Sequence, residues 1–333
     1  MKILVTGTGG FLGKKIAVSL LMNGIRHIRL HFRQHPPIGF LEELRAAFPV
    51  ATIEPVFANL LSRDLRSMVN GVDCVIHAAA GMRGAVADMF ANSVIGTRNL
   101  LEAVCDENVK RVVLISSFSV YRTVDLKTGS LVTEDTELEP DGPEKGPYGY
   151  SKTRQEALFR SFQKKHGFES VILRPGVIYG PGSGALSPRV GIRAMGVFFS
   201  LGGRAILPLT YVDNCASAVA QAVLRAPNDS VFNVVDDDLP TCNQYLHQYR
   251  KLVAPMRTLH VPYWALLLGS RALVRYHRVS KGQLPAIFTP YIVRSMYRRF
   301  KYSNAALKNI GWQPEFSTER AMEISFDYWK KHN

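Results

Sequence analysis

Short apolar runs and amphipathic segments alternate along the first half of the chain. The runs are continuously apolar, as in the VVLIS segment near residue 115, which indicates strands buried on both faces of a parallel sheet. The segments between them repeat apolar residues near the helical period of 3.6. We therefore expect strands at 2–6, 27–32, 52–57, 73–77, 111–116 and 170–173, and helices at 11–22, 40–48, 86–106 and 147–165.

This order of elements predicts an α/β fold with a Rossmann-type, doubly wound parallel sheet, because repeated βα units cross over with one hand. The second half is less regular. We expect residues 1–175 to form a dinucleotide-binding domain, to which the chain returns over roughly 205–235, and residues 176–333 to form mainly a smaller, mixed substrate lobe. A loop is expected at 123–146, helices at 190–199, 214–225 and 318–329, and short strands at 205–207 and 231–235.

The first predicted strand runs directly into a glycine-rich turn. Gly7, Gly10 and Gly13 follow it, and the first helical pattern begins at Phe11. Glycine allows a tight turn in which backbone N–H groups approach a pyrophosphate at the positive end of the helix. A strand, a glycine turn and a helix are the context that a dinucleotide site requires. The alternative is a glycine turn without a ligand.

A second candidate site combines Ser117, Tyr148 and Lys152. Tyr148 and Lys152 are four residues apart, so they share one face of a helix. A nearby ammonium lowers the pKa of a phenol and makes the pair a proton-transfer device near neutral pH. Lys152 can also hold the cofactor ribose. Ser117 follows a strand end, where its hydroxyl could bind the carbonyl or alcohol oxygen of a substrate. The alternative is an ordinary Tyr–Lys pair on an amphipathic helix.

Seven motifs in order give the chain a family resemblance: TGTGGFLG, HAAA, NSVIGTRNLLEA, SSFSVY, PYGYSK, LRPGVIYGPG and YVDN. The sequence resembles the extended short-chain dehydrogenase/reductases over nearly its whole length. The resemblance implies a nicotinamide cofactor, a homodimer and the catalytic set Ser117, Tyr148 and Lys152. The cofactor-binding residues that it implies are Gly7, Gly10, Phe11, Leu12, Gly13, Arg33, Asn59, Leu60, Ala78, Ala79, Asn92, Ser116, Tyr148, Lys152, Pro175 and Val177.

Arg33 bears on which nicotinamide cofactor is used. Members that prefer NAD usually hold the adenosine ribose with an acid at the end of the second strand. The first acidic residue here is Glu42, and Arg33 stands where a 2′-phosphate could be met. We therefore predict NADP in preference to NAD; the alternative is that Arg33 is only a surface residue. Asn59 replaces the aspartate usual in the adenine segment, a mild departure because an amide still bonds the ring.

Neighbours of the proposed catalytic residues bear on the reaction. Family dehydratases usually carry an acid beside the serine, and this chain has Phe118 there. Arg174-Pro175-Gly176 resembles the 3β-hydroxysteroid dehydrogenase-like branch. We expect an oxidoreductase that interconverts an alcohol and a ketone on a bulky, sterol-like or other lipid-like substrate. The alternatives are a nucleotide-sugar epimerase or reductase and a non-catalytic cofactor-sensing protein. The substrate pocket is expected near Tyr179, Met195 and Tyr211.

Basic charge is concentrated in the second half. The net charge is +14, and residues 239–314 contain no aspartate or glutamate. Such a surface favours an anionic partner: a phosphorylated substrate, an acidic membrane or nucleic acid, although no motif supports the last. The alternative is a solvated basic surface without a partner. Residues 261–276 form an apolar, arginine-edged segment that could lie on a membrane or pack on the core. The basic residues are Arg250, Lys251, Arg257, Arg271, Arg275, Arg278, Lys281, Arg294, Arg298, Arg299, Lys301 and Lys308.

The composition bears on the number of domains, the cellular compartment and the presence of a metal. The chain has 333 residues, 47% of them apolar, which suits one large α/β domain or a domain with a smaller lobe. It has no apolar run long enough to span a membrane, and the opening strand leaves no room for a signal peptide. Four scattered cysteines indicate reduced thiols in the cytoplasm, and no cluster has metal-ligand spacing, so no metal is predicted.

Overall fold

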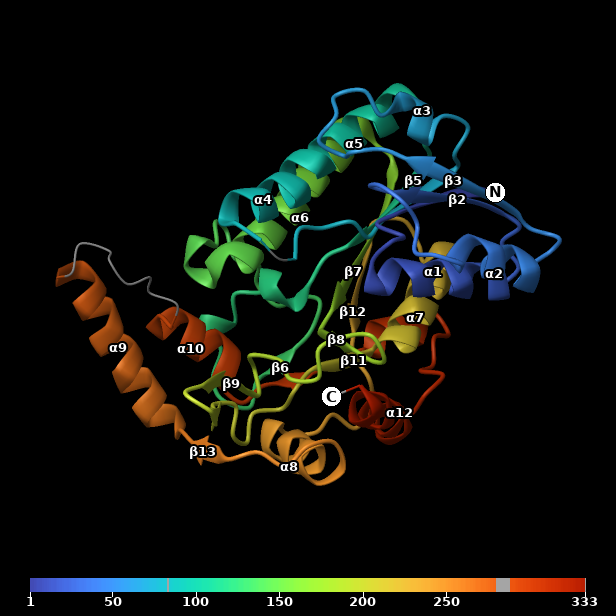
Figure 1. Cartoon of the computed structure of the whole chain (residues 1–333). Helices are drawn as coiled ribbons and strands as arrows, with labels where there is room; N and C mark the ends of the chain where they lie inside the picture. The colour runs from blue at the N-terminus through green and yellow to red at the C-terminus, as the bar shows by residue number, and fades with distance from the viewer. Residues whose placement is uncertain (83, 280–287, 333) are drawn as a thin grey trace.

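A seven-stranded parallel sheet forms the centre of the computed structural model, which describes residues 1–82, 84–279 and 288–332. The predicted Rossmann-type sheet is confirmed. The strand order is β12-β7-β5-β4-β1-β2-β3, so its direction of growth reverses between β1 and β4 (Figure 1). Open α/β sheets bind ligands at such a reversal. The strands are β1 (Lys2–Thr6), β2 (His27–Phe32), β3 (Thr52–Phe57), β4 (Cys74–His77), β5 (Arg111–Ile115), β7 (Glu169–Pro175) and β12 (Ser230–Val234).

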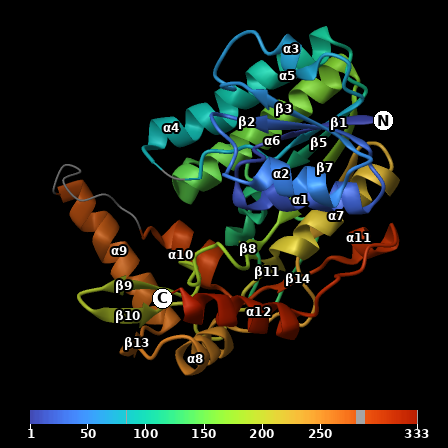
Figure 2. The same cartoon turned by 45° about the vertical axis from the view of Figure 1, so that its right-hand side comes forward.

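Helices cover both faces of this sheet (Figures 1 and 2). One face carries α1 (Phe11–Met22), α2 (Phe40–Ala47) and α7 (Val212–Arg225). The buried alanines of α7 allow this helix to pack closely against α1. The other carries α3 (Arg66–Val69), α5 (Gly96–Asp106) and α6 (Gly146–His166). The helix expected at 86–106 is divided into α4 (Val86–Phe90), a π-helical turn (Ala91–Ile95) and α5.

Smaller sheets and five helices make up most of the second half. β9 (Gly191–Ala194), β10 (Val197–Ser200) and β13 (Thr258–His260) form one sheet. β8 (Val177–Tyr179) pairs with β11 (Leu209–Tyr211), and β6 (Leu131–Val132), inside the expected loop, pairs with β14 (Lys301–Tyr302). The domain boundary at residue 175 stays a prediction, although β12 does return to the main sheet. The helices are α8 (Cys242–Leu252), α9 (Tyr263–Val279), α10 (Pro290–Tyr297), α11 (Ala305–Asn309) and α12 (Thr318–Lys331).

Two predictions in the second half are wrong. The expected helix at 190–199 is the β9–β10 hairpin, which turns at Met195 and Gly196 with φ of 49° and 75°. A Cβ at Gly191 would lie 2.1 Å from the carbonyl oxygen of Phe199, so glycine permits the close pairing of these strands. The expected strand at 205–207 is a single bridge from Ile206 to Thr241, and the nearby strand is β11.

Candidate active site

The turn between β1 and α1 has the geometry of an anion site. Gly7 has a φ of +73°, and a Cβ there would lie 2.9 Å from the backbone of Ala79. A Cβ at Gly13 would lie 2.3 Å from the carbonyl oxygen of Gly7, so both positions require glycine. In α1, whose residues are all described, Gly10 offers no side-chain cap and the first turn holds no acid. The N–H groups at this positive helix end therefore fit a pyrophosphate.

His31 is hydrogen-bonded to the same turn. Its Nδ1 accepts a hydrogen bond from the N–H of Gly7 at 3.3 Å, and its Nε2 donates to the carbonyl oxygen of Ala58 at 2.9 Å. Burial lowers the pKa of His31, which keeps the ring neutral and Nδ1 able to accept. Arg33, two residues further along the chain, is exposed, and its contact with a cofactor stays a prediction. The sequence analysis did not identify His31, the histidine that is hydrogen-bonded to the turn.

Other predicted cofactor residues lie around the β1–β4 reversal. Ala78 and Ala79 follow β4, and the N–H of Ala79 donates to Thr6 Oγ1 at 3.2 Å. Phe11 lies beside Gly180 and Gly182. Leu60 is buried against Gly96, and Asn59 is exposed. Asn92 donates to the carbonyl oxygen of Asp88 at 2.7 Å, while Leu12, Pro175 and Val177 are half-buried or buried.

Ser117, Tyr148 and Lys152 are brought together where β5 ends against α6. The ammonium of Lys152 donates to the carbonyl oxygen of Ile115, the last residue of β5, at 2.9 Å. Ser117 follows two residues later, and its Oγ accepts from the N–H of Ser119 at 3.1 Å. Tyr148 lies one helical turn before Lys152 on α6. These three residues make up the candidate cluster.

The electrostatics of this cluster differ from the expectation. We expected Lys152 to lower the pKa of Tyr148, but burial dominates and raises it. Burial also lowers the pKa of Lys152 to about 8, while the carboxylate of Glu156 acts in the opposite direction. Removal from water disfavours the charged form of each group. Near neutral pH the cluster therefore contains a protonated phenol and an ammonium close to its titration range.

A chain of buried hydrogen bonds joins Lys152 to the glycine turn. The ammonium donates to Gln155 Oε1 at 2.8 Å, and Gln155 Nε2 donates to Thr97 Oγ1 at 2.9 Å. Thr97 donates its own proton to the carbonyl oxygen of Ser93, so its oxygen accepts from His77 Nε2 at 2.8 Å. His77 Nδ1 then accepts from Thr6 Oγ1 at 2.8 Å. Burial lowers the pKa of His77 to about 3 and keeps it neutral.

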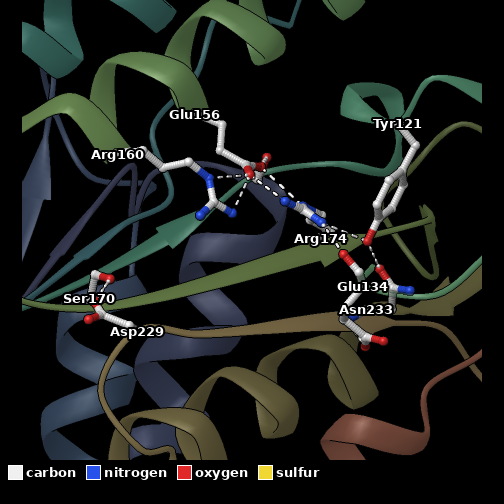
Figure 3. A network of polar contacts seen from close by, with 9 residues as sticks. Tyr121, Glu134, Glu156, Arg160, Ser170, Arg174, Asp229 and Asn233 are labelled. Carbon is white, nitrogen blue, oxygen red and sulfur yellow. Dashed lines mark hydrogen bonds and ion pairs between the residues drawn. The ribbon is translucent and has the colours of Figure 1, made fainter. Parts of the chain in front are cut away.

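A second buried network begins one residue further along α6 (Figure 3). Glu156 accepts from Arg174 at 2.5 Å, from Ser116 at 2.5 Å and from Arg160 at 2.9 Å. Arg174 also donates to the hydroxyl of Tyr121 at 2.8 Å. The Ser116 hydroxyl thus bonds to Glu156, and its backbone N–H donates to the carbonyl oxygen of Leu173 at 2.7 Å, so both donors of this residue are used within the protein.

The three predicted pocket residues, Tyr179, Met195 and Tyr211, do not line one pocket, because Met195 lies apart from the two tyrosines. Tyr179 and Tyr211 are buried and contact each other edge to face at 5.6 Å, so they belong to the core beneath β8 and β11. Met195 is fully exposed at the tip of the β9–β10 hairpin. The sequence also missed Gln155 and His77 as site residues. Gln155 could have been found from its spacing, because it stands three positions after Lys152 on the same helix and therefore on the same face.

Comparison with known proteins identifies the family. The model of the "NAD dependent epimerase/dehydratase family" matches residues 3–234. The chain belongs to this family. Its predicted resemblance to the extended short-chain dehydrogenase/reductases is confirmed.

Curated relatives within and around this family carry several activities. The chain is 32% identical over 199 residues to an uncharacterized UDP-glucose epimerase of Bacillus subtilis, covering 54% of this chain and 58% of the relative. A human sterol-4-alpha-carboxylate 3-dehydrogenase, decarboxylating, is 27% identical over 339 residues, covering 96% of this chain and 86% of the relative. The chain thus spans little more than half of some relatives, such as the first, and most of others.

Solved structures share the fold. The crystal structure of gox2253 has a TM-score of 0.80 at 21% identity, over 100% of this chain and 98% of that chain. A UDP-glucuronic acid 4-epimerase from Bacillus cereus, solved in complex with NAD, has a TM-score of 0.71 at 22% identity, over 100% of this chain and 99% of that chain. At these identities the likeness concerns the fold.

Proposed function

We propose that this protein is an NAD(P)-dependent oxidoreductase that interconverts an alcohol and a ketone on a bulky hydroxyl or carbonyl substrate. The observation that carries the proposal is the cluster at the end of β5. There the buried ammonium of Lys152 bonds to the carbonyl oxygen of Ile115, two residues before Ser117, and Tyr148 lies one helical turn before Lys152. Gln155, Thr97 and His77 connect Lys152 to the end of the strand that leads into the glycine turn, so a proton-transfer group here would lie near a bound dinucleotide.

Each side chain of the cluster has a distinct role in this proposal. The hydroxyl of Ser117 donates a hydrogen bond to the substrate oxygen and stabilises charge that develops there. Tyr148 donates a proton to that oxygen when a ketone is reduced and takes one when an alcohol is oxidised. Lys152 has three N–H groups, of which two bond to Ile115 and Gln155, and the third would hold the cofactor ribose. The nicotinamide, when bound, supplies or accepts the hydride.

The raised pKa of Tyr148 favours reduction over oxidation. A phenol that stays protonated at neutral pH can act at once as an acid toward a ketone oxygen, whereas oxidation needs the phenolate. Arg33 supports NADP as the cofactor, because its exposed guanidinium at the end of β2 can meet a 2′-phosphate in bidentate fashion. We therefore propose that the favoured direction of the reaction is the reduction of a ketone by NADPH.

Two arginines bear on the substrate class. A nucleotide-sugar substrate carries a diphosphate, which calls for free guanidinium groups near the site. Arg174 is buried and bonded to Glu156, and Arg189 donates to the carbonyl oxygen of Met296 at 3.1 Å. The guanidinium of Arg174 is occupied by protein acceptors, which supports a lipid-like ketone or alcohol over a nucleotide sugar; Arg189 uses one of its five donors on the backbone. The human sterol dehydrogenase, similar over most of its length, agrees with this choice.

The substitution Tyr148→Phe tests the mechanism. It should lower kcat for ketone reduction at least about a hundred-fold, because proton transfer by a positioned side chain contributes that much or more. The Kd for NADPH, measured by fluorescence titration, should stay within about two-fold. Tyr150→Phe is the matched control, since Tyr150 lies on the same helix and stacks on Phe90. Undiminished turnover in Tyr148→Phe would contradict the mechanism, and tighter binding of NADH than NADPH would contradict the role of Arg33.

A further inference from the structure

Helix α9 has two apolar faces, and one of them is packed against no other apolar residue among those that the structure describes. Tyr263, Leu266 and Leu267 are partly buried and pack on Val293 and Tyr297 of α10. The other face is open to solvent. Figures 1 and 2 both show α9 in orange at the edge of the molecule, with α10 beside it. The exposed large side chains are Trp264 (66%), Leu268 (54%), Tyr276 (54%) and Val279 (76%).

These exposed side chains lie along one face of the helix, which the exposed Arg271 and Arg275 share. Trp264 and Leu268 are four residues apart, and Ala272 and Tyr276 continue the same spacing, so they lie on neighbouring turns of one face. Single exposed apolar residues need no explanation, whereas a contiguous apolar stripe on one helix face indicates an interaction surface. An aromatic residue stands near each end of the stripe, and tryptophan and tyrosine are enriched where protein meets the lipid headgroups.

Charge identifies the occupant of this stripe. Arg271 and Arg275 are exposed on the same helix, and α9 contains no acidic residue. The absence of acids extends through the sequence from residue 239 to residue 314. A protein partner of ordinary composition carries charges of both signs and does not match a surface that is only basic. An anionic lipid surface matches it, because each arginine near the lipid contributes electrostatic attraction while the apolar side chains enter the headgroup boundary.

We propose that the outer face of α9 docks this protein onto an anionic membrane, with Trp264, Leu268 and Tyr276 entering the interface and Arg271 and Arg275 facing the lipid phosphates. The helix lies on the surface rather than crossing it. Within the described part of the chain, no helix has both the length and the apolar character to span a bilayer. This surface contact is independent of the proposed catalytic function, and its test needs no turnover.

The test uses the full-length protein and vesicles of phosphatidylcholine with or without phosphatidylglycerol. Binding is measured by co-sedimentation at low ionic strength and again at high salt, which screens the arginines. Trp264 provides a second readout, since Trp312 and Trp329 are buried. We expect binding to the anionic vesicles only, reversal by salt, and a blue shift of tryptophan emission that is absent in Trp264→Phe.

Two paired variants separate the apolar and electrostatic contributions. Arg271→Gln with Arg275→Gln, and Trp264→Ser with Leu268→Ser, should each weaken binding about ten-fold or more. Lys164→Gln with Lys165→Gln is the charge control, and Met22→Ser with Val50→Ser is the apolar control; all four positions are exposed elsewhere. Both controls should bind as the wild type does. Failure of the wild type to bind anionic vesicles overturns the proposal, as does a homodimer that the α9 variants dissociate without any lipid binding.

Discussion

Helix α6 sends neighbouring side chains into two buried networks of different character. Lys152 and Gln155 lead to His77 and the glycine turn, and Glu156 leads to Arg174. Each network contains a buried cation. In the first, the acceptors of the cation are a backbone carbonyl and an amide, both neutral. In the second, the guanidinium of Arg174 bonds to the carboxylate of Glu156 at 2.5 Å.

The two arrangements have opposite effects on charge. Neutral acceptors do not offset the full desolvation free energy of a buried ammonium, so the pKa of Lys152 falls to about 8. The second network does offset that cost: burial alone would raise the pKa of Glu156, but Arg174, Ser116 and Arg160 together outweigh it and lower that pKa. A buried pair with complete hydrogen bonding stays charged and holds its elements in place. Lys152, whose two hydrogen-bond acceptors are neutral, is therefore the cation that can change protonation near neutral pH, whereas Arg174 stays charged.

The largest expected effect concerns the ion pair. Arg174→Met should lower the free energy of unfolding by about 3–5 kcal/mol, because it leaves the carboxylate of Glu156 buried without its main partner. Urea unfolding followed by circular dichroism measures this loss. Arg160→Met is the control, since Arg160 contacts the same carboxylate at 2.9 Å with a side chain that is 42% exposed. That variant should lose no more than about 1 kcal/mol. Equal losses would mean that burial does not distinguish the two contacts.

A smaller effect concerns Lys152 and pH. Its folded pKa of about 8 lies below the ordinary value of 10.5, so between these values the unfolded chain binds more protons than the folded one. Stability attributable to Lys152 therefore rises with pH across this window, by roughly 3 kcal/mol in total. Lys152→Met should lack that rise. Lys145, whose pKa burial also lowers to about 8, is present in both proteins, so the difference between them isolates Lys152.

Urea unfolding at about pH 7.5 and about pH 9.5 measures that difference. The wild type should gain stability relative to Lys152→Met on going to the higher pH. A constant difference would show that the buried ammonium carries no extra cost, and the contrast with Arg174 would then fail.

The main sheet and the glycine turn could be predicted because their signals are local. Continuous apolar runs mark parallel strands, and the Gly7–Gly13 spacing marks the turn. The hairpin at Met195 could not, because the segment VGIRAMGVFF carries apolar residues compatible with a helix, and the pairing of Gly191 with Ser200 is a tertiary contact.

The candidate site divides in the same way. Tyr148 and Lys152 are visible from their spacing in one helix, and Ser117 from its position after a strand. The path from Lys152 to Thr6 joins α5, α6, β1 and β4, and its central residues, Gln155 and His77, are 78 positions apart. The direction of the pKa of Tyr148 depended on burial, which the spacing of Tyr148 and Lys152 does not reveal.

The smallest expected effect tests the neutral acceptor itself. Gln155→Leu removes the carbonyl oxygen that accepts from Lys152 at 2.8 Å. Loss of a hydrogen bond to a charged group should lower the pKa of Lys152 further, by about one unit. The alkaline limb of kcat/KM against pH should then move to lower pH. Gln163→Leu, on the same helix but bonded to Asp229 at the surface, should leave the limb in place.

Gln155→Glu makes the opposite change at the same position. A carboxylate beside Lys152 gives the first network the charge pairing of the second, so the pKa of Lys152 should rise and the alkaline limb should move to higher pH. A purely structural role for Gln155 would lower the rate at every pH in both variants without moving the limb. Opposite displacements in the leucine and glutamate variants would therefore show that the missing countercharge, and not packing, keeps Lys152 close to its titration range.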